Sequence, residues 1–154
     1  GDAALGLLLL KQRKSALRLR GKDEKFLIRR YRLPEPRMAL GKKITPLASA
    51  SMDISDGLVA DLGHIASASK VGAVIETARL PLSRAARAAL AADRHLLRAI
   101  LTGGDDYEIL FTARTVPAGL PVTRIGRIVR GKGVTVLDPT GTTLRLRRGG
   151  YTHF

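Results

Sequence analysis

Hydrophobic and polar positions follow two periods along the chain, one typical of helices and one typical of strands. Apolar residues recur at three- and four-residue spacings in several segments, as in a helix with one buried face. Helices are therefore expected at residues 3–19, around 26–31, and at 37–47, 57–65, 84–92 and 95–101. Short apolar or alternating runs predict strands at residues 48–52, 73–78, 109–111, 122–129, 134–137 and 143–146. Strands interleaved with helices and ending in an antiparallel section indicate an α/β or α+β fold, with a mixed sheet flanked by helices.

Three of the expected helices carry signals at their starts. Asp2 is a suitable N-cap for the first helix, and Ser83 is one for the helix at 84–92. Pro36 suits the first helical position of the segment 37–47, because its fixed φ fits a helix and its missing N–H is not needed there.

The stretch MDISDGLVADLGHI, residues 52–65, carries the most distinctive chemistry. Asp53 stands where a short buried strand ends, and Ser55, Asp56 and Gly57 form the turn that opens the next helix. Two carboxylates three residues apart can share a hard divalent cation such as Mg²⁺. The first backbone N–H groups of the helix would also point toward a bound anion. A capping aspartate beside a solvated neighbour is the plain alternative, and the short pattern does not separate the two.

A second acidic turn lies in LTGGDDYEILFT, residues 101–112. Two glycines, which allow a ligand to approach the backbone closely, stand directly before Asp105 and Asp106. Alternation along the following strand puts Glu108 on a half-buried face, which makes it a candidate ligand contact. The two aspartates could order metal-bound water, but the pattern gives them no definite role. A solvated turn is the alternative.

Composition limits the classes of protein that fit. The chain has 154 residues, 45% hydrophobic and 26% charged, which is typical of one globular domain. No apolar run reaches the roughly 18 to 20 residues of a membrane helix. The absence of cysteine excludes disulfides and thiolate metal sites, and a cytoplasmic location is expected. His64 is expected to be a surface or core residue, because no second histidine or glutamate stands at ligand spacing from it.

The net charge of +14 attracts nucleotides, phosphorylated metabolites and nucleic acids alike. The basic residues are spread in pairs such as Arg29-Arg30 and Lys42-Lys43, and Tyr31 is the only aromatic residue in a basic cluster. A nucleic-acid module would more typically interleave aromatic and basic residues. Such a module is therefore an alternative that the sequence does not favour.

Six segments occur in order that closely resemble the thiamine-monophosphate kinase family: GDAALGL, MDISDGLVADLGHI, LPLS, LTGGDDYEILFT, TRIGRI and GGYTHF. The resemblance runs from Gly1 to Phe154 and concerns only the carboxyl-terminal half of the family pattern. The family is part of the aminoimidazole ribonucleotide synthetase and selenophosphate synthetase superfamily, whose members bind ATP between an amino-terminal and a carboxyl-terminal α/β domain. The resemblance implies the fold of that carboxyl-terminal domain.

The resemblance also implies a reaction, in which the γ-phosphoryl group of ATP passes to the phosphate of thiamine monophosphate and gives thiamine diphosphate. Such transfer depends on positioning and on neutralising charge with metal ions. By the family pattern, Asp53 and Asp56 would hold Mg²⁺, and Ser55 would contact ATP. Glu108 and Tyr151 would contact thiamine monophosphate, and the ring of Tyr151 suits a cationic thiazolium.

Residues 1–154 are expected to form a single carboxyl-terminal domain, because nothing in them resembles the amino-terminal ATP-binding domain. We expect the isolated domain to lack kinase activity and the complete protein to be a homodimer. Three alternatives stay open: another ATP-using synthetase of the superfamily, a basic nucleic-acid-binding module, and a structural domain whose acidic turns only cap helices.

Overall fold

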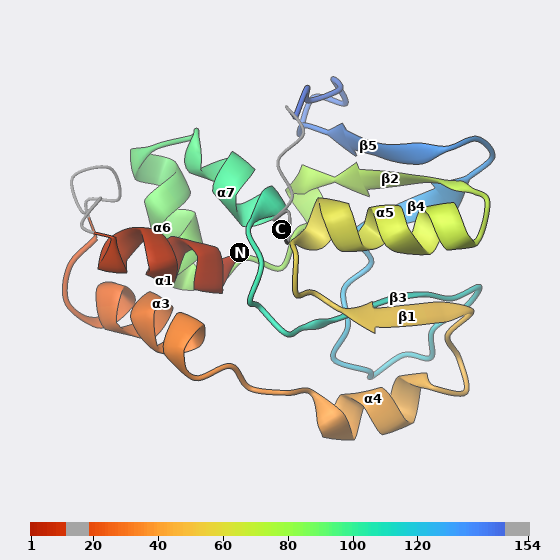
Figure 1. Ribbon diagram of the computed structural model, residues 1–154, viewed down its shortest axis with the longest axis horizontal. Helices are drawn as coiled ribbons and strands as arrows, with labels where there is room; N and C mark the ends of the chain where they lie inside the picture. Colours follow the sequence, from red (N-terminus) through yellow and green to blue (C-terminus); the bar gives the residue numbers. More distant parts are fainter. Residues whose placement is uncertain (12–18, 147–154) are drawn as a thin grey trace, which may run out of the picture.

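The computed structural model describes residues 1–11 and 19–146, which form a helical region beside a region built around two small sheets (Figure 1). In chain order the elements are α1 (Asp2–Leu10), α3 (Lys22–Arg32), α4 (Met38–Ile44), β1 (Ala50–Asp53), α5 (Leu58–Ala68), β2 (Gly72–Glu76), the 3-10 helix η1 (Thr77–Arg79), α6 (Arg84–Ala92), α7 (Leu96–Thr102), β3 (Ile109–Thr112), β4 (Gly126–Val129) and β5 (Gly133–Leu137). None of the helices in these described segments is long and apolar enough to cross a membrane.

The helical region consists of α1, α3, α6 and α7, and aliphatic side chains hold it together. Its core residues are Leu5, Leu9, Leu27, Ala85, Ala86, Ala89, Leu96 and Ile100. Gly6 stands where α1 meets α3, and a Cβ atom at this position would lie 2.1 Å from the carbonyl oxygen of Leu27. Because a side chain cannot fit there, glycine allows the two helices to touch.

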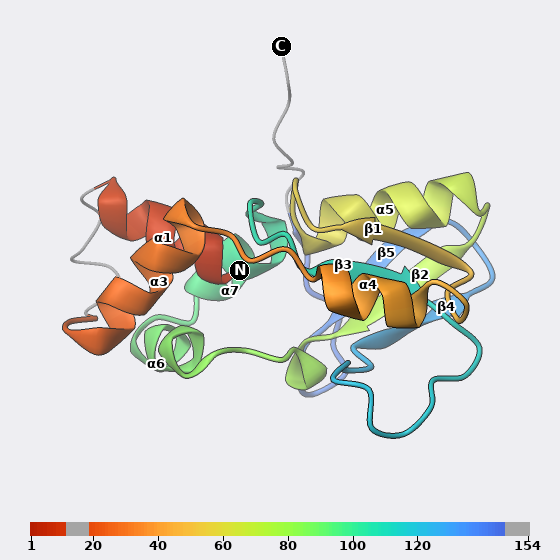
Figure 2. The same ribbon diagram turned by 90° about the horizontal axis from the view of Figure 1, so that it is seen from below.

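The sheet region contains two separate sheets and the helices α4 and α5. Strand β1 pairs antiparallel with β3, so that Asp53 lies opposite Ile109. The second sheet has the order β4-β2-β5, with β2 antiparallel to β4 and parallel to β5. Figures 1 and 2 show β1 and β3 between α5 on one side and α4 on the other. Helix α5 contacts strands of both sheets, and the shared core consists of Leu58, Leu62, Ile65, Ala66, Ala73, Ile75, Leu101, Leu110 and Val136.

The predicted mixed α/β fold is confirmed, and so is Ser83 as the N-cap of α6, because its Oγ accepts the N–H of Ala86 at 3.0 Å. The predicted cap of the first helix is wrong. Gly1 takes the N-cap position, while Asp2 lies in the first turn of α1. The carboxylate of Asp2 accepts a hydrogen bond from the Ser83 hydroxyl at 2.7 Å. Asp2 therefore ties α1 to α6 instead of capping its own helix.

Helix α4 also begins later than predicted. Arg37, and not Pro36, directly precedes its first residue, Met38. The backbone of Arg37 has φ −87° and ψ 46°, outside the helical range, while its side chain is bound to Glu108 in the sheet region. Of the first predicted helix, α1 accounts for the part up to Leu10, and residues 12–18 lie outside the described residues.

Five of the six predicted strands are present with shifted bounds, and the sixth is wrong. The strand expected to be buried at 48–52 is β1, whose residues are alternately half-buried and exposed, because it pairs with β3 alone. Residues 143–146 form no strand, and Thr143 makes only an isolated bridge to Leu137. The carboxylate of Asp138 accepts the N–H groups of residues 140 and 142 at 2.8 and 2.9 Å. These hydrogen bonds fix the turn after β5, but they do not add a further strand to the sheet.

Candidate active site

The two acidic turns predicted from the sequence lie against each other and are joined by backbone hydrogen bonds. The N–H of Asp105 donates to the carbonyl of Ser55 at 3.0 Å, and that of Tyr107 donates to Ile54 at 2.9 Å. In return, the N–H of Ile54 donates to the carbonyl of Glu108 at 2.9 Å. The segments 53–57 and 103–108, which are about a third of the chain apart in sequence, therefore form one edge of the sheet region.

Glycines make this contact possible. A Cβ atom on Gly104 would lie 1.9 Å from the carbonyl oxygen of Ser55. Gly57 has φ +128°, a conformation that L side chains rarely adopt, and a Cβ atom there would lie 2.8 Å from the carbonyl oxygen of Thr102. Tyr107 also has a positive φ, +51°, although it is not glycine. Strained backbone of this kind persists where the surrounding structure holds it, and it occurs often at functional sites.

Asp61 organises the turn before α5 from inside the protein. This residue is fully buried, and its Oδ2 accepts the backbone N–H groups of Ser55, Asp56 and Gly57 at 3.1, 3.1 and 3.0 Å. These three N–H groups are therefore not open to a bound anion, whereas an anion at the first N–H groups of the helix itself, from Leu58 onward, stays a prediction. Sequence reasoning missed Asp61, although an acidic residue in the first turn of a helix is a recognised stabilising signal.

Asp56 lies in a group of possible cation ligands with Asp61 and His64, whose ligand atoms are within 4.8 Å of one another. The Oδ1 atom of Asp61 is buried and has no hydrogen-bond partner among the described residues. His64, which was expected to be either a surface or a core residue, is exposed. Its place beside two carboxylates was not predicted. Asp53, the partner expected for Asp56, is not a member of this group.

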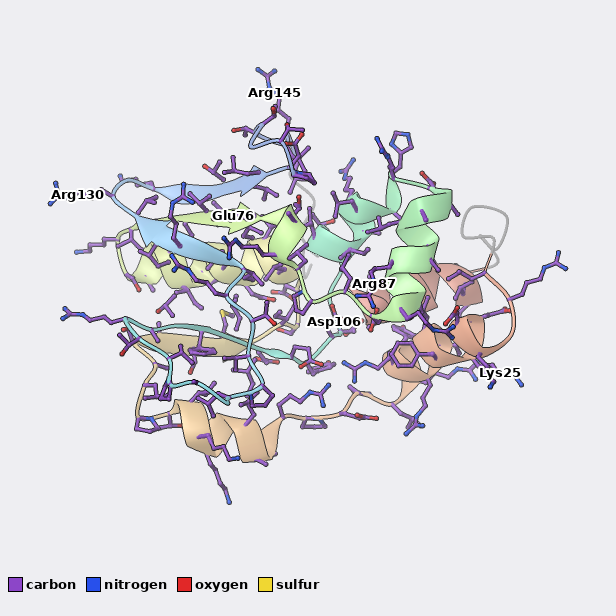
Figure 3. The ribbon with its side chains drawn as sticks, turned by 180° about the vertical axis from the view of Figure 1, so that it is seen from behind. Lys25, Glu76, Arg87, Asp106, Arg130 and Arg145 are labelled. Carbon is purple, nitrogen blue, oxygen red and sulfur yellow. The ribbon has the colours of Figure 1, made fainter. Side chains whose placement is uncertain are left out.

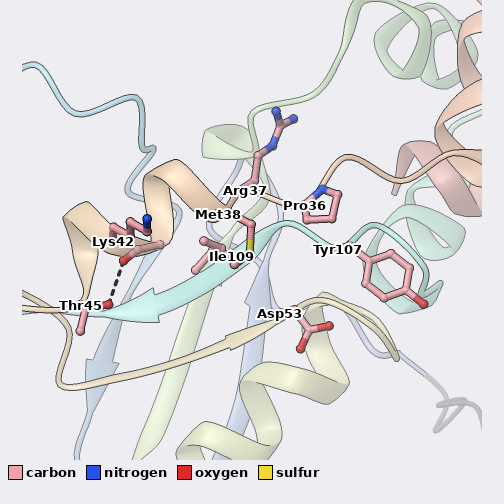
Figure 4. A pocket seen from close by; sticks show the side chains of 9 residues that line it. Pro36, Arg37, Met38, Lys42, Thr45, Asp53, Tyr107 and Ile109 are labelled. Carbon is pink, nitrogen blue, oxygen red and sulfur yellow. Dashed lines mark hydrogen bonds between the residues drawn. The ribbon is translucent and has the colours of Figure 1, made fainter.

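Asp53 instead faces a pocket of about 350 Å³ between α4 and the ends of β1 and β3 (Figure 4). The pocket is lined by Pro36, Arg37, Met38, Gly41, Lys42, Thr45, Asp53, Tyr107 and Ile109. Tyr107 and Ile109, two positions apart along the chain, line it together. The pocket thus combines one carboxylate, two basic side chains and an apolar wall.

Glu108 lies at the same edge and is bound by two arginines. Its Oε1 accepts from Arg30 Nη2 at 2.9 Å and from Arg37 Nη2 at 2.7 Å, and its Oε2 accepts from Arg37 Nε at 2.9 Å. Partial burial raises the pKa of the Glu108 carboxyl, but the hydrogen bonds and charges of Arg37 and Arg30 outweigh it and leave the pKa below its ordinary value. These pairs could not be predicted from local patterns, because Arg30 and Arg37 stand 78 and 71 positions from Glu108.

Asp106 is turned into the protein and away from any role in ordering metal-bound water. It is 5% exposed, and its Oδ1 accepts the N–H of Ala3 at the start of α1 at 3.0 Å. Its carbonyl oxygen accepts from Arg30 at 3.4 Å. Asp106 therefore joins the helical region to the acidic turns. Tyr151, the remaining predicted site residue, lies outside the described residues.

The positive charge is distributed over the whole molecule. Figure 3 shows Lys25 and Arg87 on the helical region and Arg130 and Arg145 on the sheet region, with Asp106 between the two regions. Two further arginines are neutralised by Glu108. This distribution does not favour a nucleic-acid interface, which would gather basic groups along one face.

The fold and the joined acidic turns define the class of protein to which the chain belongs. Its architecture is that of the aminoimidazole ribonucleotide synthetase type, and it is shared with E. coli HypE at a TM-score of 0.67 and 21% identity, a likeness of fold alone. No family model matches the sequence.

Relatives specify the family within that class. Thiamine-monophosphate kinase from Escherichia coli (strain K12) is 36% identical over the whole chain, which spans 50% of that relative. The same enzyme from Aquifex aeolicus is 40% identical, with 92% of this chain and 47% of the relative covered. A solved structure of AaThiL complexed with AMPPCP and TMP superposes with a TM-score of 0.83 at 36% identity, covering 99% of this chain and 48% of that one. The chain belongs to the thiamine-monophosphate kinase family and corresponds to the carboxyl-terminal half of its members. It spans about half the length of the curated relatives it matches.

Proposed function

We propose that the chain supplies the carboxyl-terminal half of a site at which ATP phosphorylates thiamine monophosphate to thiamine diphosphate in the presence of Mg²⁺. The observation that carries this proposal is the joining of the two acidic turns. Three backbone hydrogen bonds hold Asp53, Ser55 and Asp56 beside Glu108 at one edge of the sheet region. Residues that the family pattern assigns to metal, nucleotide and substrate are thereby neighbours, as one phosphoryl-transfer site requires.

The relatives support the same substrates. AaThiL, which matches nearly the whole of this chain, was solved with AMPPCP, an analogue of ATP, and with TMP. We take TMP to be thiamine monophosphate, the substrate named by the relatives' common description. Direct phosphoryl transfer, without a covalent enzyme intermediate, requires that the enzyme bind ATP and the phosphate acceptor at the same time. One relative holds an ATP analogue and TMP together.

The donor atoms at this edge fit Mg²⁺. Asp53 and Asp56 offer carboxylate oxygens, which this hard cation prefers, and the partnerless buried oxygen of Asp61 beside Asp56 adds negative charge. In our proposal Asp53 and Asp56 hold the metal, which when bound neutralises the phosphate charge. The imidazole of His64 is a less suitable ligand for Mg²⁺.

The remaining residues bind and orient the substrates. Ser55, in the turn fixed by Asp61, contacts ATP, while Glu108 and Tyr151 contact thiamine monophosphate. Glu108 has the charge to attract the cationic ring system, and its low pKa keeps it ionised at neutral pH. No nucleophilic side chain is needed, because the phosphate of thiamine monophosphate is itself the acceptor.

The proposal also concerns the rest of the protein. In it, residues 1–154 are one carboxyl-terminal domain, and an amino-terminal ATP-binding domain completes the site. The complete protein is a homodimer, and the chain by itself has no kinase activity. Formation of thiamine diphosphate from ATP and thiamine monophosphate by the purified 154-residue chain would contradict the last point.

A titration tests the assignment of the acidic turn. Thiamine monophosphate and Mg²⁺-ATP are titrated into the wild-type chain, Asp56→Asn and Asp93→Asn, with binding followed by calorimetry or by NMR chemical shifts. Asp93 is a matched control, because its carboxylate accepts one backbone N–H in a turn outside the site. We expect weak binding by wild type and Asp93→Asn, and weaker Mg²⁺-ATP binding by Asp56→Asn. Identical titrations of all three proteins would remove Asp56 from the site.

A further inference from the structure

The carboxylate of Glu108 has both oxygens occupied by arginine. Arg37 binds it with two parallel hydrogen bonds, to Oε2 at 2.9 Å and to Oε1 at 2.7 Å, and Arg30 shares Oε1 at 2.9 Å. Bidentate arginine–carboxylate pairs are among the stronger polar contacts in proteins. A ligand that is to use Glu108 must therefore compete with a guanidinium group that is already bound.

The two arginines differ in how firmly they are held. The side chain of Arg30 is 10% exposed, projects from the last turn of α3, and also donates to the carbonyl of Asp106 at 3.4 Å. The side chain of Arg37 is 40% exposed and comes from the connection before α4. Breaking the ion pair between Arg30 and Glu108 would leave the buried guanidinium group of Arg30 without its carboxylate, which is costly. Arg37 can instead move into solvent when its own pair with Glu108 breaks. Arg37 is therefore the displaceable partner of Glu108.

Arg37 also lines the pocket that contains Asp53, together with Lys42. In Figure 4 its guanidinium group points away from Asp53, as its pairing with Glu108 requires. If Arg37 releases Glu108, its nearest other carboxylate in the structure is Glu35, at 3.9 Å. Guanidinium groups match phosphate oxygens as well as they match carboxylates. A phosphate in the pocket would thus give Arg37 a new ion-pair partner that it can bind as well as it binds Glu108.

We propose that Arg37 determines specificity for the phosphorylated substrate: it exchanges Glu108 for the substrate's phosphate, while Arg30 keeps Glu108 in position for the cationic ring. This inference rests on the proposed function and adds the residue that distinguishes thiamine monophosphate from thiamine. With the phosphate present, one ion pair is replaced by two. With thiamine, the ring takes Glu108 and Arg37 keeps only the exposed carboxylate of Glu35 at 3.9 Å, so binding is penalised.

The test compares the binding of thiamine and of thiamine monophosphate to the 154-residue chain in Mg²⁺ buffer, using wild type, Arg37→Gln, Arg37→Lys and Arg29→Gln. Arg29 is the control for net charge, since its side chain is 71% exposed and pairs with Glu35 at 3.5 Å. For Arg37→Gln we expect thiamine monophosphate to bind roughly tenfold more weakly, as loss of a charge-assisted contact implies. Thiamine should bind as well as before or better, because Glu108 is freed.

Arg37→Lys should keep part of the preference for the phosphorylated ligand, and Arg29→Gln should keep all of it. If Arg37 had a merely structural role, its substitution would lower the affinity for both ligands equally and leave the ratio of the two affinities unchanged. That result would overturn this inference alone. Wild-type chain that binds neither ligand would overturn the proposed function and the role of Arg37 together. Circular dichroism confirms that each variant is folded before it is titrated.

Discussion

The helical region and the sheet region are stabilised by different kinds of contact. In the helical region, leucines and alanines from α1, α3, α6 and α7 fill the core, and Gly6 lets two helices touch. At the edge of the sheet region, buried carboxylates and glycines hold irregular turns: Asp61 satisfies three N–H groups, and Gly104 admits the carbonyl of Ser55. Side-chain packing stabilises the fold of the helical region. Hydrogen bonds stabilise the turns at the edge of the sheet region, and the proposed site depends on the same hydrogen bonds.

This difference explains where the chemistry lies. The core of the helical region consists of aliphatic side chains, which cannot bind an ion or a phosphate, whereas the polar turns held from behind present their remaining side chains outward. The two regions still depend on each other, because Arg30 reaches Glu108 from α3 and Asp106 accepts the N–H of Ala3 in α1. Variants that damage one region should therefore reveal how far the effect reaches into the other.

The largest effect is expected from Asp61→Ala. Losing a carboxylate that accepts three backbone N–H groups at a fully buried position should lower the free energy of unfolding by about 3 kcal/mol, and ligand binding at the acidic turns should disappear. Urea denaturation measures the first and titration the second. Asp93→Ala, which removes a single such contact at an exposed turn, should cost far less. Equal midpoints for the two variants would contradict the role given to Asp61.

Gly6→Ala should break the helical region in a different way. The added methyl group meets the carbonyl oxygen of Leu27, so α1 and α3 must separate, and the cost should be about 2 kcal/mol. Gly63→Ala is the matched control on α5, where the nearest atom to a new Cβ is 4.0 Å away, and it should stabilise by about 0.5 to 1 kcal/mol. Because α3 carries Arg30, only Gly6→Ala should also weaken binding through Glu108. The same stability change in both variants would refute the close helix contact.

Ser83→Ala tests how strongly one cap supports the helical region. The change removes the acceptor for the N–H of Ala86 and the donor to Asp2, and it should cost about 1 kcal/mol in urea denaturation. Ser67→Ala, at an exposed position of α5, should change stability very little. Titration of thiamine monophosphate should be unaffected by either change. A fall in ligand affinity in Ser83→Ala would show that the two regions are coupled more tightly than the contacts at Arg30 and Asp106 imply.

The smallest effect concerns pH. The pKa of Glu108 is lowered in the folded protein, so the stability it contributes is present above the unfolded value, near 4.5, and is lost as pH falls through the folded value. Its side chain is 38% exposed, and solvent screening keeps the contribution small. Unfolding measured between pH 6 and pH 3 should show a shallower pH dependence for Glu108→Gln than for wild type. An unchanged slope would mean that the arginine pairs do not stabilise the fold.

Sequence reasoning recovered the architecture and the chain positions of the site, but not how the site is held. Ser83 was found because a cap bonds to its own helix three residues away. Asp2 was misassigned because its partner, Ser83, comes from another helix. Asp61 was missed for a similar reason, since it reaches back from α5 to accept the N–H groups of the preceding turn. Glu108 was singled out correctly as a polar residue on a half-buried face, without any indication of the arginines that bind it.

By itself, the sequence determined the order of helices and strands, the two acidic turns and the family to which they belong. These features depend on periodicity and on contacts between near neighbours, which the local order of residues encodes. Only the tertiary structure decided that the turns are joined, that Asp106 faces inward, and that Arg30 and Arg37 both bind Glu108. The two arginines lie 78 and 71 residues from Glu108, so their meeting depends on how the tertiary structure brings the end of α3 and the segment before α4 to the start of β3.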